Sequence, residues 1–362
     1  MRMSEVSSAQ AGVVAERLDL PKPSKPRAKR ALKRDETAAK PAKRAAPRNA
    51  KAKATKAEAA KPGTLPVLYM LSPQKFMSPF DCNMAIDSGY STVLPYANVG
   101  AGDVAALVQD AIFSRPPNAR TGLFIGGKDI TLALDMMNAA RHAMVPSFEV
   151  SVFADPGGSF TTAAAMVACV ERVLVRQFAR GLKGLRVAVF GATGVVGFAS
   201  SVIAAGEGAK VSIVAHDTIE ALEASAEFAA DTFNVALSPV LGNTDALKSK
   251  IIRSSDVVFT AGPAGVNILT RAQIARSPRL LVAADVNAVQ PYGIEGMDLF
   301  MNGAPLPGCS TLGVGALAIG DVKYRTQAGL FQRMIASRAA LELDFRDAFH
   351  LAREIVAAQD LK

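Results

Sequence analysis

A short apolar segment that ends in a regularly spaced glycine turn constrains the fold of this chain more than any other feature. The run Leu185-Arg186-Val187-Ala188-Val189-Phe190 is rich in β-branched residues, and glycines follow at 191, 194 and 197. A small-residue segment of helical character (198–207) and a second strand-like run (210–215) come next. Strand, tight turn, helix and strand in this order form the unit that holds a nucleotide diphosphate against a helix N-terminus.

Each glycine of this turn has a physical reason. Gly191 permits the sharp turn, Gly194 lets backbone N–H groups approach phosphates, and Gly197 lets the helix pack closely on the strand. The order of the surrounding elements favours a nicotinamide dinucleotide site, whose expected residues are Gly191, Thr193, Gly194, Val195, Val196 and Gly197. The alternative is a turn that needs three glycines for its shape alone.

The positive charge of the chain is concentrated at its N-terminus. Residues 1–62 contain 17 Lys/Arg and 6 Asp/Glu, a net charge of +11, whereas the other 300 residues contain 24 basic and 26 acidic residues, a net charge of −2. This tail lacks aromatic residues, so it cannot bury enough surface to offset the entropy of ordering. We expect a disordered tail that is either solvated without a specific partner or in salt-sensitive contact with nucleic acid or another polyanion.

The cysteine and histidine positions argue against a metal site and a disulfide framework. Both residue types are scattered, at Cys82, Cys169, Cys309, His142, His216 and His350. An odd number of isolated thiols favours a reducing compartment, which predicts a cytoplasmic protein. The tail has no apolar secretory signal, and no uncharged apolar run approaches the roughly 18–20 residues of a membrane span, so we expect no membrane contact.

Short apolar runs alternate with helical patterns along the rest of the chain. This alternation predicts an α/β fold with parallel, doubly wound sheets. We expect a basic tail over 1–64, an α/β domain over 65–160, a Rossmann-type dinucleotide domain over 161–320, and C-terminal helices over 321–362 that pack back across the cleft. The expected strands are 66–71, 121–127, 148–153, 185–190, 210–215, 235–237, 256–260 and 280–284, and the expected helices are 80–90, 104–113, 130–144, 161–178, 198–207, 218–233, 321–338 and 341–359.

Three further segments fall where ligands bind, beyond the carboxyl ends of parallel strands. The segment from Ala261 through Gly262 to residue 265 has little side-chain bulk and can pass close to a cofactor. Asn287 follows the next strand and offers a polar side chain. His216 and Asp217 end the second strand of the nucleotide unit, where the adenosine ribose is normally read.

Asp217 bears on the choice of cofactor. A carboxylate at this position accepts hydrogen bonds from a ribose diol and repels a 2′-phosphate, which favours NAD. His216 is able to contact a 2′-phosphate, so NAD and NADP both stay open. The alternative for Asp217 is that it caps the helix expected to begin near Thr218.

Lys323 is the polar residue that most resembles an active-site group. It follows the glycine-rich stretch Gly313–Gly320, which we interpret as a loop, and is expected in the first turn of a helix. The helix dipole and burial would both lower the pKa of a lysine there, as active-site lysines often require. The alternative is a surface lysine.

Several segments together resemble one family, the NAD(P)-dependent methylene-tetrahydromethanopterin dehydrogenases of bacterial one-carbon metabolism. They are Phe124-Ile125-Gly126-Gly127-Lys128-Asp129, Thr161-Thr162-Ala163-Ala164-Ala165, Ala284-Asp285-Val286-Asn287-Ala288 with Pro291-Tyr292-Gly293-Ile294-Glu295-Gly296, and Gly315-Ala316-Leu317-Ala318-Ile319-Gly320 with Lys323. The resemblance runs from about Leu65 to the C-terminus and leaves out the basic tail.

The resemblance implies a reaction and a set of site residues. The family oxidises the methylene bridge of its pterin to a methenyl bridge and passes hydride to NAD(P), without a metal, in the oxidation of formaldehyde by methylotrophs. Lys323 resembles the active-site lysine of the family, and the pterin-pocket residues carried over are Phe80, Asp81, Asp155, Thr161 and Thr162. The first domain would then bind the pterin. We expect Lys323 to be neutral or aimed at a polar group of the pterin.

Two departures from the family pattern bear on the cofactor. The NADP-specific members carry a basic residue where this chain has His216, which argues against use of NADP alone. The glycine turn reads Ala192-Thr193-Gly194-Val195-Val196, where a Gly-Thr-Gly-Pro-Val pattern is usual in the family. The alternatives to this function are the same reaction on tetrahydrofolate, and a non-catalytic NAD(P)-binding module tethered to nucleic acid by the tail. Apolar surface left over in the α/β body predicts a homo-oligomer.

Overall fold

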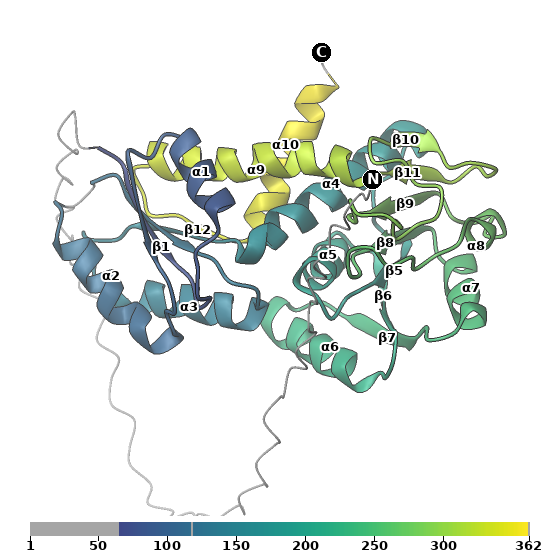
Figure 1. The fold of residues 1–362 in the computed structure, drawn as a ribbon, viewed down its shortest axis with the longest axis horizontal. Helices are drawn as coiled ribbons and strands as arrows, with labels where there is room; N and C mark the ends of the chain where they lie inside the picture. Colours follow the sequence, from purple (N-terminus) through teal and green to yellow (C-terminus); the bar gives the residue numbers. More distant parts are fainter. Residues whose placement is uncertain (1–64, 117–118, 361–362) are drawn as a thin grey trace, which may run out of the picture. The chain divides into compact units, whose positions relative to one another are not determined.

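Two mainly parallel sheets with helices on both faces make up the computed structural model, which describes residues 65–116 and 119–360 (Figure 1). The first sheet has the order β12-β4-β3-β1-β2, and all its strands are parallel. Its strands are β1 (Val67–Leu71), β2 (Thr92–Tyr96), β3 (Thr121–Ile125), β4 (Ser151–Ala154) and β12 (Glu342–Leu343). Helices α1 (Pro79–Asp87) and α9 (Ala316–Ala336) lie on one face, and α2 (Val104–Phe113) and α3 (Ile130–Ala143) on the other (Figure 1).

The second sheet has the order β10-β11-β9-β8-β5-β6-β7. Its strands are β5 (Arg186–Phe190), β6 (Lys210–Ala215), β7 (Leu237–Leu241), β8 (Val257–Thr260), β9 (Val282–Asp285), β10 (Asn302–Pro305) and β11 (Leu312–Val314). Only β10 and β11 pair antiparallel among its described strands. Without β10, the strand order is that of a Rossmann fold, and it reverses between β5 and β8. The α/β class and the dinucleotide-type second sheet are therefore confirmed.

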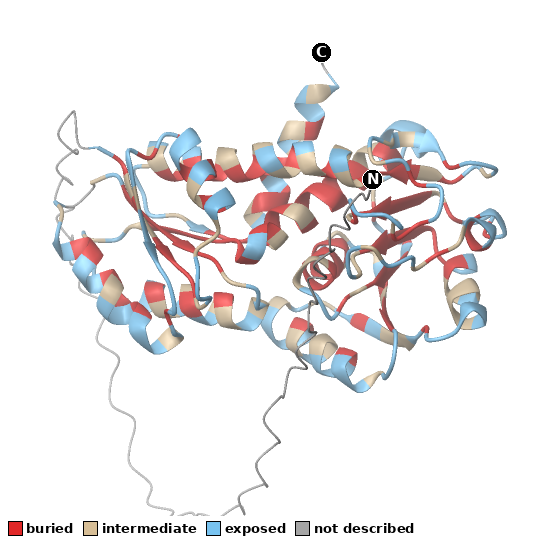
Figure 2. Ribbon diagram, in the orientation of Figure 1, coloured by how far each residue is buried: buried red, intermediate tan, exposed pale blue. Residues whose placement is uncertain are grey.

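Strand β5 shows why these strands read as continuous apolar runs. Alternate side chains of a strand point to opposite faces of its sheet. Val187 and Val189 belong to the larger apolar core, whereas Ala188 and Phe190 belong to a second core that includes Ile252 of α7 (Asp245–Arg253) and Ile274 of α8 (Arg271–Ala275). Because both faces are covered, both sets of side chains must be apolar, and the central strands of the two sheets are buried, whereas the edge strands β2, β7 and β10 are more exposed (Figure 2).

Helix α4 (Ser159–Phe178) is a largely buried helix that contacts both the second sheet and the C-terminal helices. It packs against α5 (Val195–Gly206), α9 and α10 (Phe345–Gln359), so it is apolar around most of its surface (Figure 2). By length and composition the segment Pro156–Phe178 could cross a membrane, but 72% of its apolar window is buried within the described structure. The expected return of the C-terminal helices onto the body is confirmed by these contacts.

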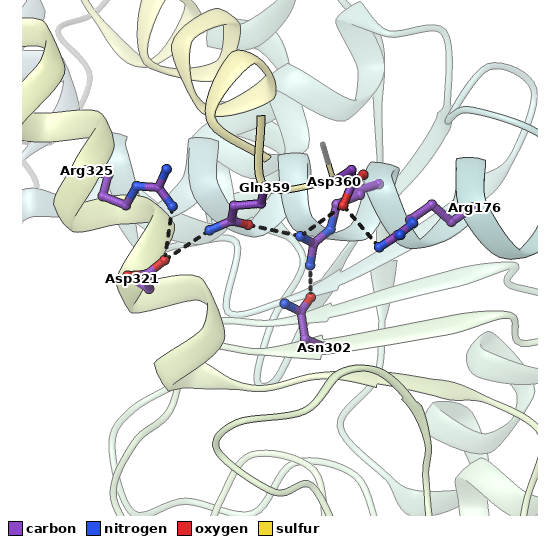
Figure 3. A network of polar contacts seen from close by, with 7 residues as sticks. Arg176, Asn302, Asp321, Arg325, Gln359 and Asp360 are labelled. Carbon is purple, nitrogen blue, oxygen red and sulfur yellow. Dashed lines mark hydrogen bonds and ion pairs between the residues drawn. The ribbon is translucent and has the colours of Figure 1, made fainter. Parts of the chain in front are cut away.

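A polar network joins four elements at the end of α10. Arg172 of α4 donates to Gln359 (2.9 Å) and to Asn302 of β10, and Gln359 donates to Asp321 of α9 (3.1 Å) (Figure 3). Asp360, just past the end of α10, pairs with Arg176 of α4 at 3.0 Å. These bonds fix the C-terminal turn of α10 against α4 and α9.

The main differences from the expected elements lie at the edges of the sheets and near the C-terminus. Strand β2 was not expected, and β4 begins at Ser151 rather than at residue 148. Residues 342–343 form β12 rather than helix, so α10 begins at Phe345. The connecting elements α7, α8, β10 and β11 were also missed. The basic tail lies outside the described residues, and the expected domain boundaries stay a prediction.

The most consequential difference concerns the start of α9. The expected loop over Gly313–Gly320 is wrong except at Gly315, because residues 313–314 belong to β11, and α9 already begins at Ala316 and contains Gly320. A Cβ on Gly315 would lie 2.7 Å from the carbonyl carbon of Leu299. This glycine is therefore required by a close backbone approach and not by a loop.

Candidate active site

Lys323 is a half-buried lysine well inside α9. It lies seven residues after the helix begins at Ala316, so its expected place in a first turn is wrong and the helix dipole does not act on it strongly. The pKa of Lys323 is nevertheless lowered, because burial disfavours the ammonium form. The carboxylates of Asp155 and Asp81 oppose this shift. The expected direction is confirmed, and its cause is desolvation.

Three groups surround the Lys323 side-chain nitrogen. Nζ donates a hydrogen bond to Oε1 of Gln327 at 2.7 Å, and it lies 3.9 Å from the centre of the Phe80 ring. A Cβ on Gly158 would come within 3.0 Å of Nζ. Phe80 and Gly158 thus cover the lysine from α1 and from the segment before α4. The structure brings together Lys323 and Phe80, two of the residues that the sequence singled out.

Gln327 connects Lys323 to a buried carboxylate. Its Nε2 donates to Oδ1 of Asp81 at 2.7 Å, while its Oε1 accepts from Lys323. Gln327 is fully buried and Asp81 is 2% exposed, so neither side chain has water as an alternative partner. Burial raises the pKa of Asp81, and the bond from Gln327 acts in the opposite direction. The sequence interpretation missed Gln327, although its position four residues after Lys323 places both on one helix face.

Asp155 is fully buried and closes the start of α4. Its Oδ1 accepts from the backbone N–H groups of Phe160 (2.9 Å) and Thr161 (3.2 Å), and its Oδ2 accepts from the Thr161 hydroxyl (2.6 Å). Burial raises the pKa of Asp155 to about 6. Thr162 donates to the carbonyl oxygen of Gly158 at 2.7 Å. These three residues hold the segment that touches Lys323, with their polar groups turned toward the protein.

The glycine turn has the shape of a backbone cradle. Gly191 adopts φ +85°, and a Cβ there would strike Ala261 and lie 2.7 Å from the nitrogen of Gly262. A Cβ on Gly197 would lie 2.7 Å from the carbonyl carbon of Gly191. The expected turn and the segment at 261–262 are therefore in contact.

The N-terminus of α5 fits a phosphate group. Gly194 is the N-cap and provides no side-chain acceptor for the first-turn N–H groups, and both Thr193 and Gly194 are exposed. Val195 and Val196, the first two helical residues, are half-buried. Free N–H groups and the positive end of the helix dipole attract an anion such as a dinucleotide pyrophosphate.

His216 and Asp217 follow β6 at the same edge of the sheet as the glycine turn. Both side chains are exposed, at 82% and 87%, and their Nε2 and Oδ1 atoms are 3.9 Å apart. Helix α6 (Glu220–Phe233) has Ile219 as its N-cap residue, without a side-chain cap. The alternative that Asp217 caps this helix is therefore wrong, and its carboxylate is accessible to a ribose.

Asn287 joins two loops rather than presenting a free amide. Its Oδ1 accepts from the N–H groups of Val289 (2.9 Å) and Gly265 (3.4 Å), and its Nδ2 donates to the carbonyl oxygen of Pro291 (3.2 Å). The neighbouring Asp285 accepts from the Thr260 hydroxyl at 2.8 Å. Asn287 therefore fixes the 261–265 segment, which in turn touches the glycine turn. Among the described residues, no group of three or more His, Cys, Asp or Glu could hold a metal ion.

Comparison with known proteins gives one consistent result. A family model described as the N-terminal part of methylene-tetrahydromethanopterin dehydrogenase matches residues 79–157. The NAD(P)-dependent methylenetetrahydromethanopterin dehydrogenase of Methylorubrum extorquens is 50% identical over 291 residues, which cover 80% of this chain and 98% of that protein. The bifunctional protein MdtA of the same organism is 29% identical over the same shares of both chains.

The likeness to solved structures is much looser. Shikimate 5-dehydrogenase from Listeria monocytogenes, solved with shikimate and NAD, is 12% identical, with 81% of this chain and 97% of that chain covered and a TM-score of 0.44. An overlap at this level carries no argument about function. The 50% identity across nearly the whole Methylorubrum protein is the finding that carries weight.

Proposed function

This chain belongs to the NAD(P)-dependent methylenetetrahydromethanopterin dehydrogenase family, and from that membership we propose that it oxidises the methylene bridge of methylene-tetrahydromethanopterin. A C–H bond of the bridge breaks, the hydrogen leaves with the electron pair as hydride, and a methenyl cation remains. The nicotinamide, when bound, supplies the hydride acceptor. The observation that carries the proposal is the 50% identity over 98% of the relative.

The second sheet supplies the residues proposed to hold NAD(P). The exposed backbone of Thr193 and Gly194 and the first turn of α5 would take the pyrophosphate. Ala261 and Gly262 would lie along the cofactor, and the hydrogen bond from Gly265 to Asn287 holds their segment in place. His216 and Asp217 would meet the adenosine ribose, and their chemistry is compatible with NAD and with NADP.

The Lys323 cluster supplies the groups proposed to meet the pterin. The two nitrogens beside the bridge stabilise the methenyl cation themselves, so the protein has mainly to align two rings and exclude water. A fully charged lysine beside that cation would oppose its formation. We propose a lysine that is neutral or aimed at a polar group of the pterin, and burial lowers the pKa of Lys323 in the direction that a neutral lysine requires. Phe80 and Asp81 would border the pterin, and Asp155, Thr161 and Thr162 would position the backbone around it.

Several partner and location proposals accompany this reaction. The three cysteines are free thiols in the structure, which supports a reducing, cytoplasmic location. Homo-oligomerisation is supported by exposed large apolar residues such as Phe300 and Phe113. Non-specific polyanion contact is proposed for residues 1–62 from their net charge alone.

Purified protein assayed with two carriers and two nucleotides tests the proposal. Methenyl formation from methylene-tetrahydromethanopterin with NAD or NADP is the expected result. If turnover is faster with methylene-tetrahydrofolate, the folate carrier is the substrate instead of the methanopterin carrier. Lack of hydride transfer with both carriers, together with salt-dependent DNA binding that is lost when residues 1–62 are deleted, would support the non-catalytic module instead.

A further inference from the structure

Gln327 occupies an unusual place among the buried polar residues. It is fully buried in α9, four residues after Lys323, and both ends of its amide are used. The oxygen accepts from Nζ of Lys323 and the nitrogen donates to Oδ1 of Asp81, each at 2.7 Å. It is the one described side chain that hydrogen bonds to both of these candidate site residues.

The two charged neighbours determine how this amide is oriented. An amide has an acceptor end and a donor end, and a lysine nitrogen requires the first while a carboxylate requires the second. The reversed amide would place N–H groups against the Lys323 ammonium and a carbonyl oxygen against Asp81. In the observed orientation the amide oxygen accepts from Nζ, which lies 3.9 Å from the centre of the Phe80 ring.

We propose that Gln327 is a positioning residue for hydride transfer, because it holds the Lys323 nitrogen in place and couples its proton to the Asp81 carboxylate. The inference rests on the proposed function for its catalytic consequence, but the coupling itself does not. The charged groups that act on Lys323 in the described part of the chain are Asp81 from α1 and Asp155 from the end of β4. Gln327 is the only link between Lys323 and Asp81 among the described hydrogen bonds.

Substitutions at Gln327 should move the Lys323 proton in opposite directions. Gln327→Glu places a possible carboxylate beside Lys323, which favours the ammonium form. Gln327→Met has a similar length but removes the acceptor that stabilises the ammonium and the donor that stabilises the Asp81 carboxylate. Both losses favour the neutral lysine. The methionine variant is the one that tests the hydrogen bonds of Gln327, because a carboxylate added beside Lys323 raises its proton affinity in either case. If Gln327 merely fills space, Gln327→Met leaves the proton affinity of Lys323 unchanged.

Two measurements on the full-length protein test the proposal. The first follows acetylation of Lys323 by an amine-selective reagent as a function of pH, quantified by mass spectrometry of the Lys323 peptide without substrate. We expect the pH midpoint to rise by about one unit or more in Gln327→Glu and to fall in Gln327→Met. The second is the pH dependence of kcat and KM. Gln327→Glu should lose about tenfold or more in kcat near neutral pH and recover at higher pH, whereas Gln327→Met should lose kcat at every pH.

Thr326→Val is the matched control. Thr326 is a fully buried neighbour on the same helix, and within the described residues its hydroxyl hydrogen bonds only to the carbonyl oxygen of Val322. This variant should move neither midpoint nor pH profile. If a Gln327 variant has lost its thermal transition, Gln327→Asn takes its place, because it keeps the amide and shortens its reach; we expect the midpoint to fall as for methionine.

The outcomes separate the two proposals. An acetylation midpoint of Gln327→Met equal to that of wild type would overturn the role of Gln327, as would a loss of kcat in Gln327→Met without any change of midpoint. If the wild-type protein transfers no hydride from either carrier, the proposed function is wrong. In that case, a rise of the acetylation midpoint in Gln327→Glu and a fall in Gln327→Met would still support the coupling between Gln327, Lys323 and Asp81.

Discussion

The side-chain nitrogen of Lys323 lies 3.9 Å from the centre of the Phe80 ring, although the two residues are on different helices of the chain. The ring face attracts the ammonium, and such a contact contributes about 0.5–2 kcal/mol depending on desolvation. Phe80 is 48% exposed, so the ring contacts Lys323 and is still accessible to a ligand. The Phe80 ring is therefore able to contact Lys323 and a ligand bound at the surface of α1 at the same time.

Replacement of Phe80 by leucine should therefore weaken substrate binding more than it lowers the stability of the fold. We expect Phe80→Leu to raise KM for the pterin about tenfold and to change Tm by only a few degrees. Phe76→Leu is the control, because Phe76 is 74% exposed and has Lys75 5.3 Å above its ring. Steady-state kinetics and thermal melts check the prediction, and a KM equal to that of Phe76→Leu would contradict it.

Loss of the lysine itself should affect the chemical step. We expect Lys323→Met to lower kcat by about 100-fold or more while the Kd for NAD(P) stays within about twofold, since the proposed cofactor residues lie at the glycine turn. Lys183→Met, at an exposed position, should leave kcat unchanged. Single-turnover kinetics and nucleotide titration measure both quantities. Near-normal turnover by Lys323→Met would reject an active-site role for Lys323.

Asp155 should make the stability of the protein depend on pH. Its pKa is raised from 3.8 to about 6, so the folded state binds this proton more tightly than the unfolded state. The stability contributed by this group therefore increases as pH falls from above 6 toward 4. Comparison with Asp155→Asn isolates the effect, because other carboxyls titrate in both proteins. We expect the difference in unfolding free energy to change by about 2–3 kcal/mol in favour of wild type between pH 7 and pH 4, measured by urea unfolding; a difference that is constant with pH would exclude it.

Gly191 should tolerate no side chain, for two separate reasons. Its φ is +85°, and a Cβ would collide with the backbone at Ala261 and Gly262. Gly184 has a similar φ of +77° but no atom within 4 Å of a Cβ. We expect Gly184→Ala to cost about 1–2 kcal/mol from the backbone conformation alone, and Gly191→Ala to cost more and to abolish NAD(P) binding. Denaturant unfolding and nucleotide titration decide; equal costs at both positions would be inconsistent with the contact.

The ion pairs of Arg353 should contribute more to the stability of the fold than the other ion pairs of the C-terminal helices. Its guanidinium bonds to both oxygens of Glu171 on α4 and to Glu207 at the end of α5, and lies 4.3 Å from the Phe349 ring centre. Its removal leaves two half-buried carboxylates without a partner, so we expect Arg353→Met to destabilise the fold by about 2–3 kcal/mol.

The control for Arg353 is a pair within one helix. Arg325 and Asp321 are four residues apart on α9, with side chains 39% and 61% exposed and a separation of 3.5 Å between the paired atoms (Figure 3). Arg325→Met should cost only about 0.3–0.5 kcal/mol. Chemical unfolding of both variants provides the measurement, and a smaller loss for Arg353→Met than for Arg325→Met would disprove the assigned role.

The elements that the sequence predicted well are those in which local pattern and burial agree. The glycine turn, β6 and α2 lie where their residues place them, because apolar periodicity and punctuation by glycine are both local signals. Strand β2 was missed because Pro95 interrupts its apolar run. Proline is tolerated there because β2 is at the edge of the first sheet.

The polar site was only partly predictable, since its key contacts are long-range. Gly315 suggested a loop, but it is a glycine because the Leu299 backbone passes beside it. That error moved the start of α9 and made the helix dipole one of the two expected causes of the lowered pKa of Lys323, whereas burial, the other expected cause, accounts for it. The contact of Gln327 with Asp81 could not be predicted from local sequence, because Asp81 lies 246 residues earlier in the chain. Helical spacing from Lys323 would have been the one signal pointing to Gln327.

The pairing of β12 with β4 has a consequence for synthesis of the protein on the ribosome. Glu342 and Leu343 pair with Val152 and Phe153, so the first sheet gains its last strand only near the end of the chain. The whole second sheet is translated in between. Until residue 343 has left the exit tunnel, the edge of β4 has no strand beside it, and a nascent chain stalled before that point exposes a β edge that other chains can join.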